Sequence, residues 1–229
     1  MLYTQAVVKD NIRNRDGKRV FFLGKGDALT PGARDYLSQE RIEIRPAEEA
    51  KIEEYRLLNG GVLRDKPEHM THLYGNVLVE KTHPRIAFRG AVDLLEAELL
   101  LCQLNSPSRV RNSLGEVLEL TRLMIRCEVM EERVPEMKLC GLTEQQIRQR
   151  SHRPEEFYKQ PHFMPEYTDG AAVLHLNRCR CAARAAELAA VRAFADEAGN
   201  GIRPDILQAM NRISSMIYIL MIQVKSGEG

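Results

Sequence analysis

The chain has 229 residues, of which 44% are apolar and 6% aromatic, so it is long enough to bury a core. Its 33 Lys and Arg residues nearly balance its 32 Asp and Glu residues. This balance excludes the global positive field that attracts nucleic acid or anionic membranes. The longest apolar run, residues 213–224, is too short to span a bilayer. We therefore expect a soluble protein with no nucleic-acid and no membrane partner.

Residues 1–57 predict a small α/β module. Its predicted elements are a strand at 19–23, a short helix at 29–40 and a second strand at 41–46. Thr30 suits the N-cap of that helix, and Pro31 suits its first position. Residues 58–66 contain Gly60 and Gly61 and are interpreted as a linker. The remaining domain would then span residues 67–229.

The rest of the chain predicts a mainly α fold, an up-and-down bundle of about five helices. Apolar residues recur there every three or four positions, which is the period of an amphipathic helix. The predicted helices cover residues 84–104, 107–132, 143–151, 171–198 and 203–224. Ser106 is a candidate cap for the second, and Pro204 and Asp205 suit the first turn of the last. Long helices of this kind are typical of a bundle.

One polar stripe stands out in the fourth helix. At helical spacing, Asn177, Arg180, Arg184 and Glu187 share a face. Two guanidiniums one turn apart can clamp a multiply charged anion, because their planar forks form charge-assisted, often bidentate bonds. The alternative is a solvated face with local salt bridges of little energetic value. Taken alone, the pattern favours the solvated face.

The cysteines and histidines predict no metal centre. The five cysteines form no CxxC pair and no signal peptide precedes them, so we expect free thiols in a reducing cytoplasm. On a helix, Cys179 and Cys181 point about 200° apart and cannot chelate one ion, so both are interpreted as small core residues. His69 and His72 could form half of a metal site, but such loop histidines are usually solvated or hydrogen-bonded.

Polar residues on two other helices are further candidates for hydrogen bonds or ion pairs inside the bundle. Asn211 and Ser215 share a face of the last helix, as a small polar patch inside the bundle or as part of a site. Asp93 lies between apolar residues on the first long helix, and a buried carboxylate there would need a partner such as an arginine on a neighbouring helix.

Several segments together resemble one enzyme family. "KTHPRIAFRGAVDLLEA" (81–97), "LHLNRCRCAARAAE" (174–187) and "NRISS" (211–215) resemble, in order, motifs of the propanediol-utilisation type of cobalamin adenosyltransferases. A closer similarity is to the ethanolamine-utilisation branch of that superfamily. It is found in "LTPGARDYLSQERIEI" (29–44), "KPEHMTHL" (66–73), "HPRIAFRGAVD" (83–93) and "RPDILQAMNRISSMIYILMI" (203–222). The resemblance covers most of the chain, including the N-terminal module.

The resemblance implies an enzyme that transfers the 5′-deoxyadenosyl group of ATP to cob(I)alamin and releases adenosylcobalamin and triphosphate. It implies Mg²⁺ with the ATP, a homotrimer with sites between subunits, and a cytoplasmic location. The branch further suggests that the product supplies an ethanolamine ammonia-lyase. The N-terminal module could dock to ethanolamine-utilisation enzymes or to a bacterial microcompartment shell.

The resemblance also assigns roles to residues. The implied ATP site contains Thr71, Lys81, Arg180, Arg184, Glu187 and Asn211. Asp93 would pair with Arg180, within one chain or across the subunit interface, and these two residues and Arg184 would be catalytic. Phe163 and Met164 lie near the position of the loop that covers the lower face of the corrin.

The chain departs from the family pattern at three places. The stretch 71–81 is shorter than the family's phosphate loop and has one glycine, and Ser215 replaces the last Asp of the final motif. Residues 53–65 lack the Cys-rich metal segment of some ethanolamine-type members, so we predict no structural zinc or iron. The short loop favours an alternative, a non-catalytic corrinoid carrier or scaffold with the same bundle. The intact arginine stripe argues against it.

Overall fold

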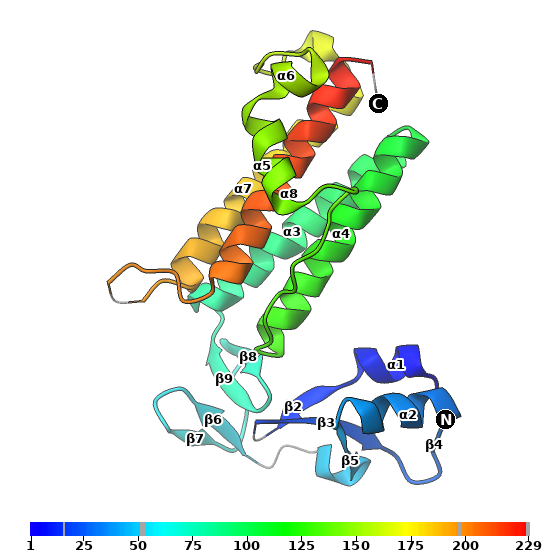
Figure 1. The fold of residues 1–229 in the computed structure, drawn as a ribbon. Coiled ribbons are helices and arrows are strands. Elements are labelled where there is room, and N and C mark those ends of the chain that lie inside the picture. Colours follow the sequence, from blue (N-terminus) through cyan, green and yellow to red (C-terminus); the bar gives the residue numbers. More distant parts are fainter. Residues whose placement is uncertain (16, 51–53, 197, 228–229) are drawn as a thin grey trace. The chain divides into compact units, whose positions relative to one another are not determined.

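The computed structural model describes residues 1–15, 17–50, 54–196 and 198–227 of the chain. These residues form two compact units, Met1–Lys81 and Thr82–Gly229 (Figure 1). The first unit contains short strands and two helices among its described residues, and the second is helical. No helix in the described ranges is long and apolar enough to cross a membrane.

The N-terminal unit begins with a β-α-β arrangement. Its first elements are β1 (Leu2–Tyr3), α1 (Gln5–Asp10), β2 (Arg13–Arg15), β3 (Lys18–Leu23), β4 (Ala28–Leu29), α2 (Pro31–Gln39), β5 (Glu43–Pro46) and the 3₁₀ turn η1 (Ala47–Ala50). β3 and β5 pair in parallel, with Val20 opposite Glu43, and α2 connects them. The Thr30 hydroxyl caps α2 by accepting a hydrogen bond from the Ala33 amide at 3.3 Å. The two strands and the helix predicted for this module are confirmed.

The structure differs from the sequence prediction at the expected linker, residues 58–66. Residues 58–61 turn the chain between β6 (Tyr55–Leu57) and β7 (Val62–Leu63), which pair antiparallel. Gly60 has a φ of 86°, a left-handed conformation that suits glycine. β6 also pairs with β9 (Val77–Glu80), and β9 pairs with β8 (Met70–Tyr74). The glycine pair thus lies in a hairpin turn. Along the chain, the first compact unit ends at Lys81 and the second begins at Thr82.

The helical unit follows the predicted pattern closely. Its elements are α3 (Pro84–Leu104), α4 (Ser108–Val129), α5 (Glu144–His152), α6 (Pro154–Tyr158), the 3₁₀ turn η2 (Tyr167–Asp169), α7 (Ala171–Ala193) and α8 (Pro204–Lys225). α3 packs against α4 and α7, and α8 packs against α4, α5 and α7. The five predicted helices are therefore confirmed, and only the short α6 was missed by the periodicity.

Several helix ends differ from the sequence prediction, among them the end of α4, which lies at Val129 and not at the predicted residue 132. α7 ends at Ala193, before the predicted end at 198, because Ala195 forms a β-bridge with Gly201 in the turn that leads to α8. Residue 197 of the predicted helix lies outside the described residues. Ser106 does not cap α4, because its hydroxyl donates to the Cys102 carbonyl at 2.7 Å. The cap position is Pro107, which makes no side-chain cap bond.

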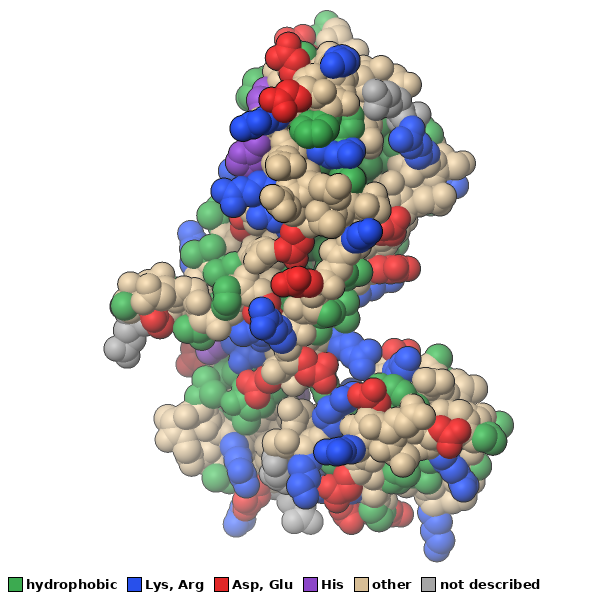
Figure 2. Space-filling view, in the orientation of Figure 1, with side chains coloured by type: hydrophobic (Ala, Val, Ile, Leu, Met, Phe, Trp, Pro, Cys, Tyr) green, Lys and Arg blue, Asp and Glu red, His purple; other side chains and the backbone are tan. Residues whose placement is uncertain are grey.

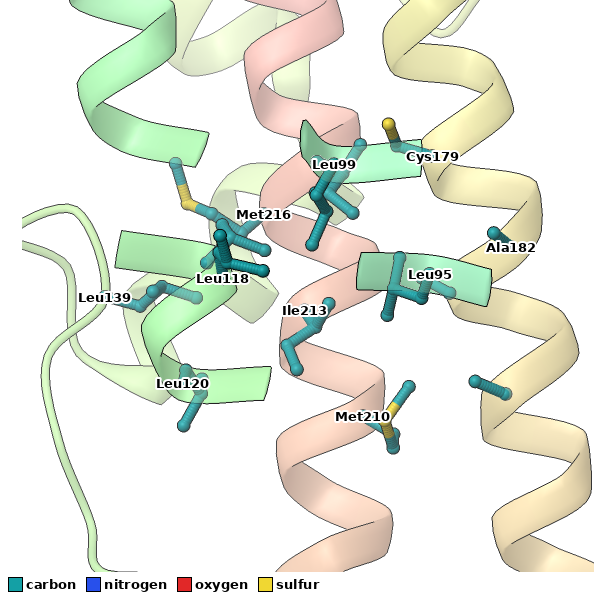
Figure 3. Packing of buried hydrophobic residues seen from close by; sticks show 14 of the residues in the cluster. Leu95, Leu99, Leu118, Leu120, Leu139, Cys179, Ala182, Met210, Ile213 and Met216 are labelled. Atoms are coloured by element: carbon teal, nitrogen blue, oxygen red, sulfur yellow. The ribbon is translucent and has the colours of Figure 1, made fainter. Parts of the chain in front are cut away.

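The bundle core lies between α3, α4, α7 and α8 (Figure 3). α3 and α4 contribute leucines such as Leu95, Leu99 and Leu118, and α8 contributes Ile213 and Met216. After Leu176, α7 presents small residues that are all fully buried: Cys179, Ala183, Ala186 and Ala190. Small side chains let neighbouring helices approach closely, so this face fixes how α7 is rotated within the bundle.

A buried ion-pair cluster joins the start of α3 to the end of α4. The Glu128 carboxylate is fully buried and accepts hydrogen bonds from Arg85 Nε at 2.5 Å and Arg89 Nε at 2.7 Å. Arg85 also donates to the Glu128 carbonyl at 3.0 Å. Because a buried carboxylate is costly without such donors, the cluster fixes the register of the two helices.

We expect Glu128→Gln to lower the free energy of unfolding by about 3 kcal/mol, because it leaves two partly buried guanidiniums without their buried counter-charge. Urea denaturation followed by circular dichroism measures this change. Glu96→Gln is the matched control, since Glu96 accepts from Arg122 across the same two helices at 2.9 Å but near the surface. The control should cost less than about 1 kcal/mol. Equal losses in the two variants would contradict this account.

Candidate functional site

A polar cleft of about 320 Å³ opens in the helical unit. It is lined by Ser151, His152, His162, Arg180, Arg184, Asn211, Ser214, Ser215 and Tyr218. α5, α7, α8 and the segment before α7 supply these residues. Histidine, Lys and Arg side chains adjoin one another on the part of this unit where α5 and α6 lie (Figures 1 and 2). None of the lining residues carries a negative charge, so the cleft favours an anionic ligand.

Arg180 is held in place by neutral groups. Its Nη2 and Nε lie 3.2 and 3.4 Å from Oδ1 of Asn177, one turn earlier on α7. Its guanidinium lies 5.7 Å from the centre of the Tyr218 ring on α8, within the range of a cation–π interaction. These contacts orient the guanidinium but leave its charge without a carboxylate partner among the described residues. Arg180 is therefore oriented and still free to bind an anion.

Arg184 lies one helical turn after Arg180 and is exposed. It makes no hydrogen bond or ion pair with any residue in the described ranges. Arg178, on another face of the same helix, contrasts with it, because its Nη2 lies 2.7 Å from the Glu98 carboxylate. Two like charges at this spacing weaken a helix slightly unless an anion lies between them. Both guanidiniums line the cleft, and their role as an anion clamp stays a prediction.

Asn211 and Glu187 form the wall behind the arginines. The Asn211 side-chain amide donates to Glu187 Oε1 at 2.8 Å and so joins α8 to α7. Its carbonyl oxygen accepts from Arg212 Nη1 at 3.1 Å. Both ends of the Asn211 amide are engaged, and its orientation is fixed. The structure therefore brings together four of the residues predicted for the ATP site: Arg180, Arg184, Asn211 and, behind them, Glu187.

Other predicted residues lie elsewhere. Thr71 lies in β8 and Lys81 directly after β9, so both belong to the N-terminal unit. Asp93 is exposed on α3 and forms no ion pair or hydrogen bond with the described residues. The predicted pair with Arg180 does not form within the described part of one chain, and a pair between subunits stays a prediction.

The stretch 71–81, which replaces the family's phosphate loop, is a β-hairpin. Its turn contains Gly75 at a φ of 51°. A Cβ added at Gly75 would lie 2.7 Å from the Asn14 carbonyl oxygen, so the glycine permits close backbone packing inside the N-terminal unit. This glycine therefore has a structural task that is separate from phosphate binding.

The two residues predicted to contact the corrin differ in exposure. Phe163 is partly buried, with its ring centre 6.3 Å from that of Tyr218 and 4.3 Å from Lys225 Nζ. Met164 is 86% exposed. The loop between α6 and η2 thus has an anchored residue next to an apolar one that faces solvent.

The sequence analysis missed three groups of the cleft: His152, His162 and Tyr218. Tyr218 follows Asn211 by seven residues, so helical spacing places both on one face of α8 and could have revealed it. The histidines come from the end of α5 and from a loop, and no periodic signal identifies such positions.

The cysteine pair behaves as predicted at one position only. Cys179 is fully buried, and its thiol donates to the Glu98 carbonyl at 3.2 Å. Its hydrogen bond with Cys102 and its burial raise its pKa, so the thiol stays protonated. Cys181 is exposed, so its prediction as a core residue was wrong; the angle of about 200° that separates the two thiols places it on the outer face. Within the described ranges, no three His, Cys, Asp or Glu side chains are grouped as a metal site requires.

Comparisons with known proteins show the family of this chain. Residues 62–224 match the model of the family described as Cobalamin adenosyltransferase. The chain therefore belongs to the cobalamin adenosyltransferase family.

Relatives from Salmonella typhimurium and Escherichia coli carry the name corrinoid adenosyltransferase EutT. The protein from Salmonella typhimurium is 31% identical over 157 residues, which are 69% of this chain and 59% of that protein. The protein from Escherichia coli K12 is 26% identical over 242 residues, with 96% of this chain and 90% of that protein covered. The match thus spans less than two thirds of the Salmonella relative and most of the Escherichia coli one.

Solved structures support the fold. Variants of a PduO-type ATP:corrinoid adenosyltransferase from Lactobacillus reuteri, complexed with cobalamin and ATP, superpose with a TM-score of 0.53 at 17% identity. For the first variant, the match covers 70% of this chain and 89% of that one. The predicted helical bundle of this family is confirmed.

We expect the cleft to bind inorganic tripolyphosphate, and Arg184→Ala to weaken that binding about tenfold or more, because one charge-assisted contact is lost. Isothermal titration calorimetry measures the dissociation constants. Arg178→Ala removes the same charge from another face of α7 and should change the constant by no more than about twofold. Equal weakening in both variants would show a diffuse charge effect and exclude a specific clamp.

Proposed function

We propose that this family member is an ATP:cob(I)alamin adenosyltransferase, which transfers the 5′-deoxyadenosyl group of ATP to cob(I)alamin and releases adenosylcobalamin and triphosphate. One observation carries the proposal: Arg180 and Arg184 stand one turn apart in a cleft whose lining residues include no carboxylate. A triphosphate supplies the negative charge that these two guanidiniums lack.

The reaction needs charge stabilisation more than it needs a base. Cob(I)alamin is a strong nucleophile, and the electron pair of its cobalt attacks the 5′-carbon of the ribose and forms the Co–C bond. The bond from that carbon to the triphosphate oxygen breaks, and its electron pair leaves with the triphosphate. Arg180 and Arg184 stabilise the charge that grows on this leaving group. The corrinoid supplies the reactive metal, and the protein supplies position and electrostatics.

Asn211 and Glu187 hold the geometry of this clamp. Their hydrogen bond keeps α7 and α8 in one register behind the arginines. In this proposal ATP would bind together with Mg²⁺, an ion whose preferred ligands are phosphate and carboxylate oxygens. Glu187 is the carboxylate that adjoins the cleft, and one of its oxygens is free of the Asn211 bond. These oxygens fit a hard cation held mainly by phosphates.

The corrin lies against the loop that contains Phe163 and Met164. An apolar surface beneath the ring excludes a lower axial ligand, and the loss of that ligand makes Co(II) easier to reduce. Phe163 is anchored on Tyr218, and the exposed Met164 side chain offers the apolar surface.

The working assembly is a homotrimer with its sites between subunits. Two features support this. Leu94, Leu101 and Leu104 on α3 and Leu188 on the adjacent α7 are more than half exposed, and single domains rarely leave such large apolar patches uncovered. Asp93 lies beside Leu94 without a partner among the described residues. A neighbouring copy would bury the leucines and bring its Arg180 to this Asp93.

The family resemblance extends the proposal to partners and domains. The resemblance places the adenosyltransferase domain at residues 67–229 and makes Thr71 and Lys81 ATP-contacting residues. Because both belong to the compact unit that ends at Lys81, we assign the domain to the helical unit that begins at Thr82. Residues 1–57 form a module that docks to ethanolamine-utilisation enzymes or a microcompartment shell in the cytoplasm. The product supplies an adenosylcobalamin-dependent ethanolamine ammonia-lyase. These statements rest on the similarity to the ethanolamine-utilisation branch.

A non-catalytic corrinoid carrier is the second candidate. The hairpin at 71–81, which takes the place of the phosphate loop, favours it. The unpaired arginines argue against it, because a carrier needs no triphosphate clamp. Titration of ATP into the protein separates the two, since a pure carrier would show no binding.

We expect Arg184→Ala to lower kcat/KM for adenosylation at least about 100-fold while the fold is kept, because it removes one stabilising contact to the leaving triphosphate. The assay follows the absorbance of the adenosyl–cobalt bond after ATP, Mg²⁺ and chemically reduced cob(I)alamin are mixed with the protein. Circular dichroism checks the fold. A variant that works at the wild-type rate with saturating ATP would refute this role of Arg184.

The proposed contact between subunits predicts complementation. Asp93→Ala and Arg180→Ala should each be weakly active alone, because each destroys the pair. When both are co-expressed, random mixing restores intact sites at about a quarter of the interfaces, and activity should rise accordingly. A mixture that stays at the mean of the two single variants would argue that the residues do not act across an interface.

A further inference from the structure

Tyr218 stands at the centre of the cleft and contacts both of its sides. It lies on the same face of α8 as Asn211 and lines the cleft with Arg180 and Arg184. Its ring centre is 5.7 Å from the Arg180 guanidinium and 6.3 Å from the Phe163 ring centre. Among the described residues, Tyr218 is the side chain that contacts both the arginine clamp and the loop 162–166.

The Tyr218 hydroxyl has a defined partner in that loop. It lies 2.9 Å from His162 Nδ1, and the two rings are nearly parallel, at 7°. The other ring nitrogen, Nε2, lies 3.2 Å from the His152 carbonyl oxygen. A carbonyl only accepts, so Nε2 carries the hydrogen. In the neutral ring Nδ1 then accepts, and the Tyr218 hydroxyl donates to it.

His162 is thus fixed at both nitrogens, between the end of α5 and the middle of α8. Lys225 forms a separate tether. Its Nζ lies 2.6 Å from the Asp169 carboxylate, after the loop, and 4.3 Å from the ring centre of Phe163, within the loop. The His162 bond is the tether that passes through the cleft itself.

We propose that Tyr218 is a positioning residue with two separable tasks. Its ring holds the Arg180 guanidinium toward the triphosphate, and its hydroxyl, through His162, holds the loop 162–166 toward the corrinoid. One side chain then couples the two halves of the cleft. The inference rests on the proposed adenosyltransferase function for the identity of the two ligands, and on the contacts above for the coupling.

The two tasks can be separated by substitution. Tyr218→Phe keeps the ring under Arg180 and removes the hydroxyl. It should raise the KM for cob(I)alamin about three- to tenfold, the effect of one lost hydrogen bond, and leave the KM for ATP unchanged. Tyr218→Leu removes the ring as well and should also raise the KM for ATP, about two- to fivefold, through loss of the cation–π contact.

A double-mutant cycle tests the His162 link. His162→Phe breaks the bond to Tyr218 and also the one to the His152 carbonyl, so it should raise the KM for cob(I)alamin at least as much as Tyr218→Phe does. The double variant should match His162→Phe alone, because the Tyr218 hydroxyl then has no bond to the loop left to lose. Tyr167→Phe is the control, since Tyr167 is 88% exposed and its hydroxyl bonds to no described residue. Additive effects, or a Tyr218→Phe variant that changes both KM values equally, would overturn the proposal.

Hydrogen exchange supplies a readout that does not depend on activity. Amides of residues 162–169 should exchange faster in Tyr218→Phe than in the wild type, at least as fast in His162→Phe, and at the wild-type rate in Tyr167→Phe. If the wild-type protein forms no adenosylcobalamin, the proposed function fails while this exchange pattern still decides whether Tyr218 anchors the loop. Unchanged exchange in both variants would overturn the anchoring role.

Discussion

The orientation of α7 is the constraint on which the site depends. From Cys179 onward its fully buried face consists of small residues, Cys179, Ala183, Ala186 and Ala190, on a helix that packs against α3 and α8. Larger residues on that face would force the helices apart, and another rotation would expose this face and bury charge. With the small residues turned inward, Arg180 and Arg184 are directed into the cleft. The core packing thus sets the direction of the functional side chains.

The distribution of counter-charges gives the cleft its chemical character. Elsewhere in the helical unit, arginines such as Arg85, Arg89 and Arg203 contact carboxylates on the same or a neighbouring helix. At Asp205, burial would raise the pKa, but hydrogen bonds from Arg203 and the Val134 amide outweigh it and lower the pKa to about 2. The clamp arginines form no ion pair with a carboxylate in the described ranges. This difference separates arginines that stabilise the fold from arginines that are available to bind an anion.

The sequence predicts those features that follow from local periodicity. The helix 84–104 is correct to the residue, because Pro84 opens it and its apolar residues keep the helical period. Spacing alone placed Arg180, Arg184 and Asn211 on their faces. It could not distinguish a glycine pair in a linker from one in a hairpin turn, so β6 and β7 were missed. His152 and His162 reach the cleft through tertiary folding, which no spacing encodes. Asp93 has no partner among the described residues of one chain, so spacing within the chain could not identify one.

The most direct test of the central claim follows the fate of both halves of ATP. Wild-type protein is mixed with ATP, Mg²⁺ and reduced cob(I)alamin, and the phosphorus products are observed by NMR while visible absorbance follows the Co–C bond. The account predicts one intact triphosphate for each adenosylcobalamin formed, since the arginines hold the triphosphate as a single leaving group. Formation of pyrophosphate and phosphate in its place, or corrinoid binding without any Co–C bond, would contradict it.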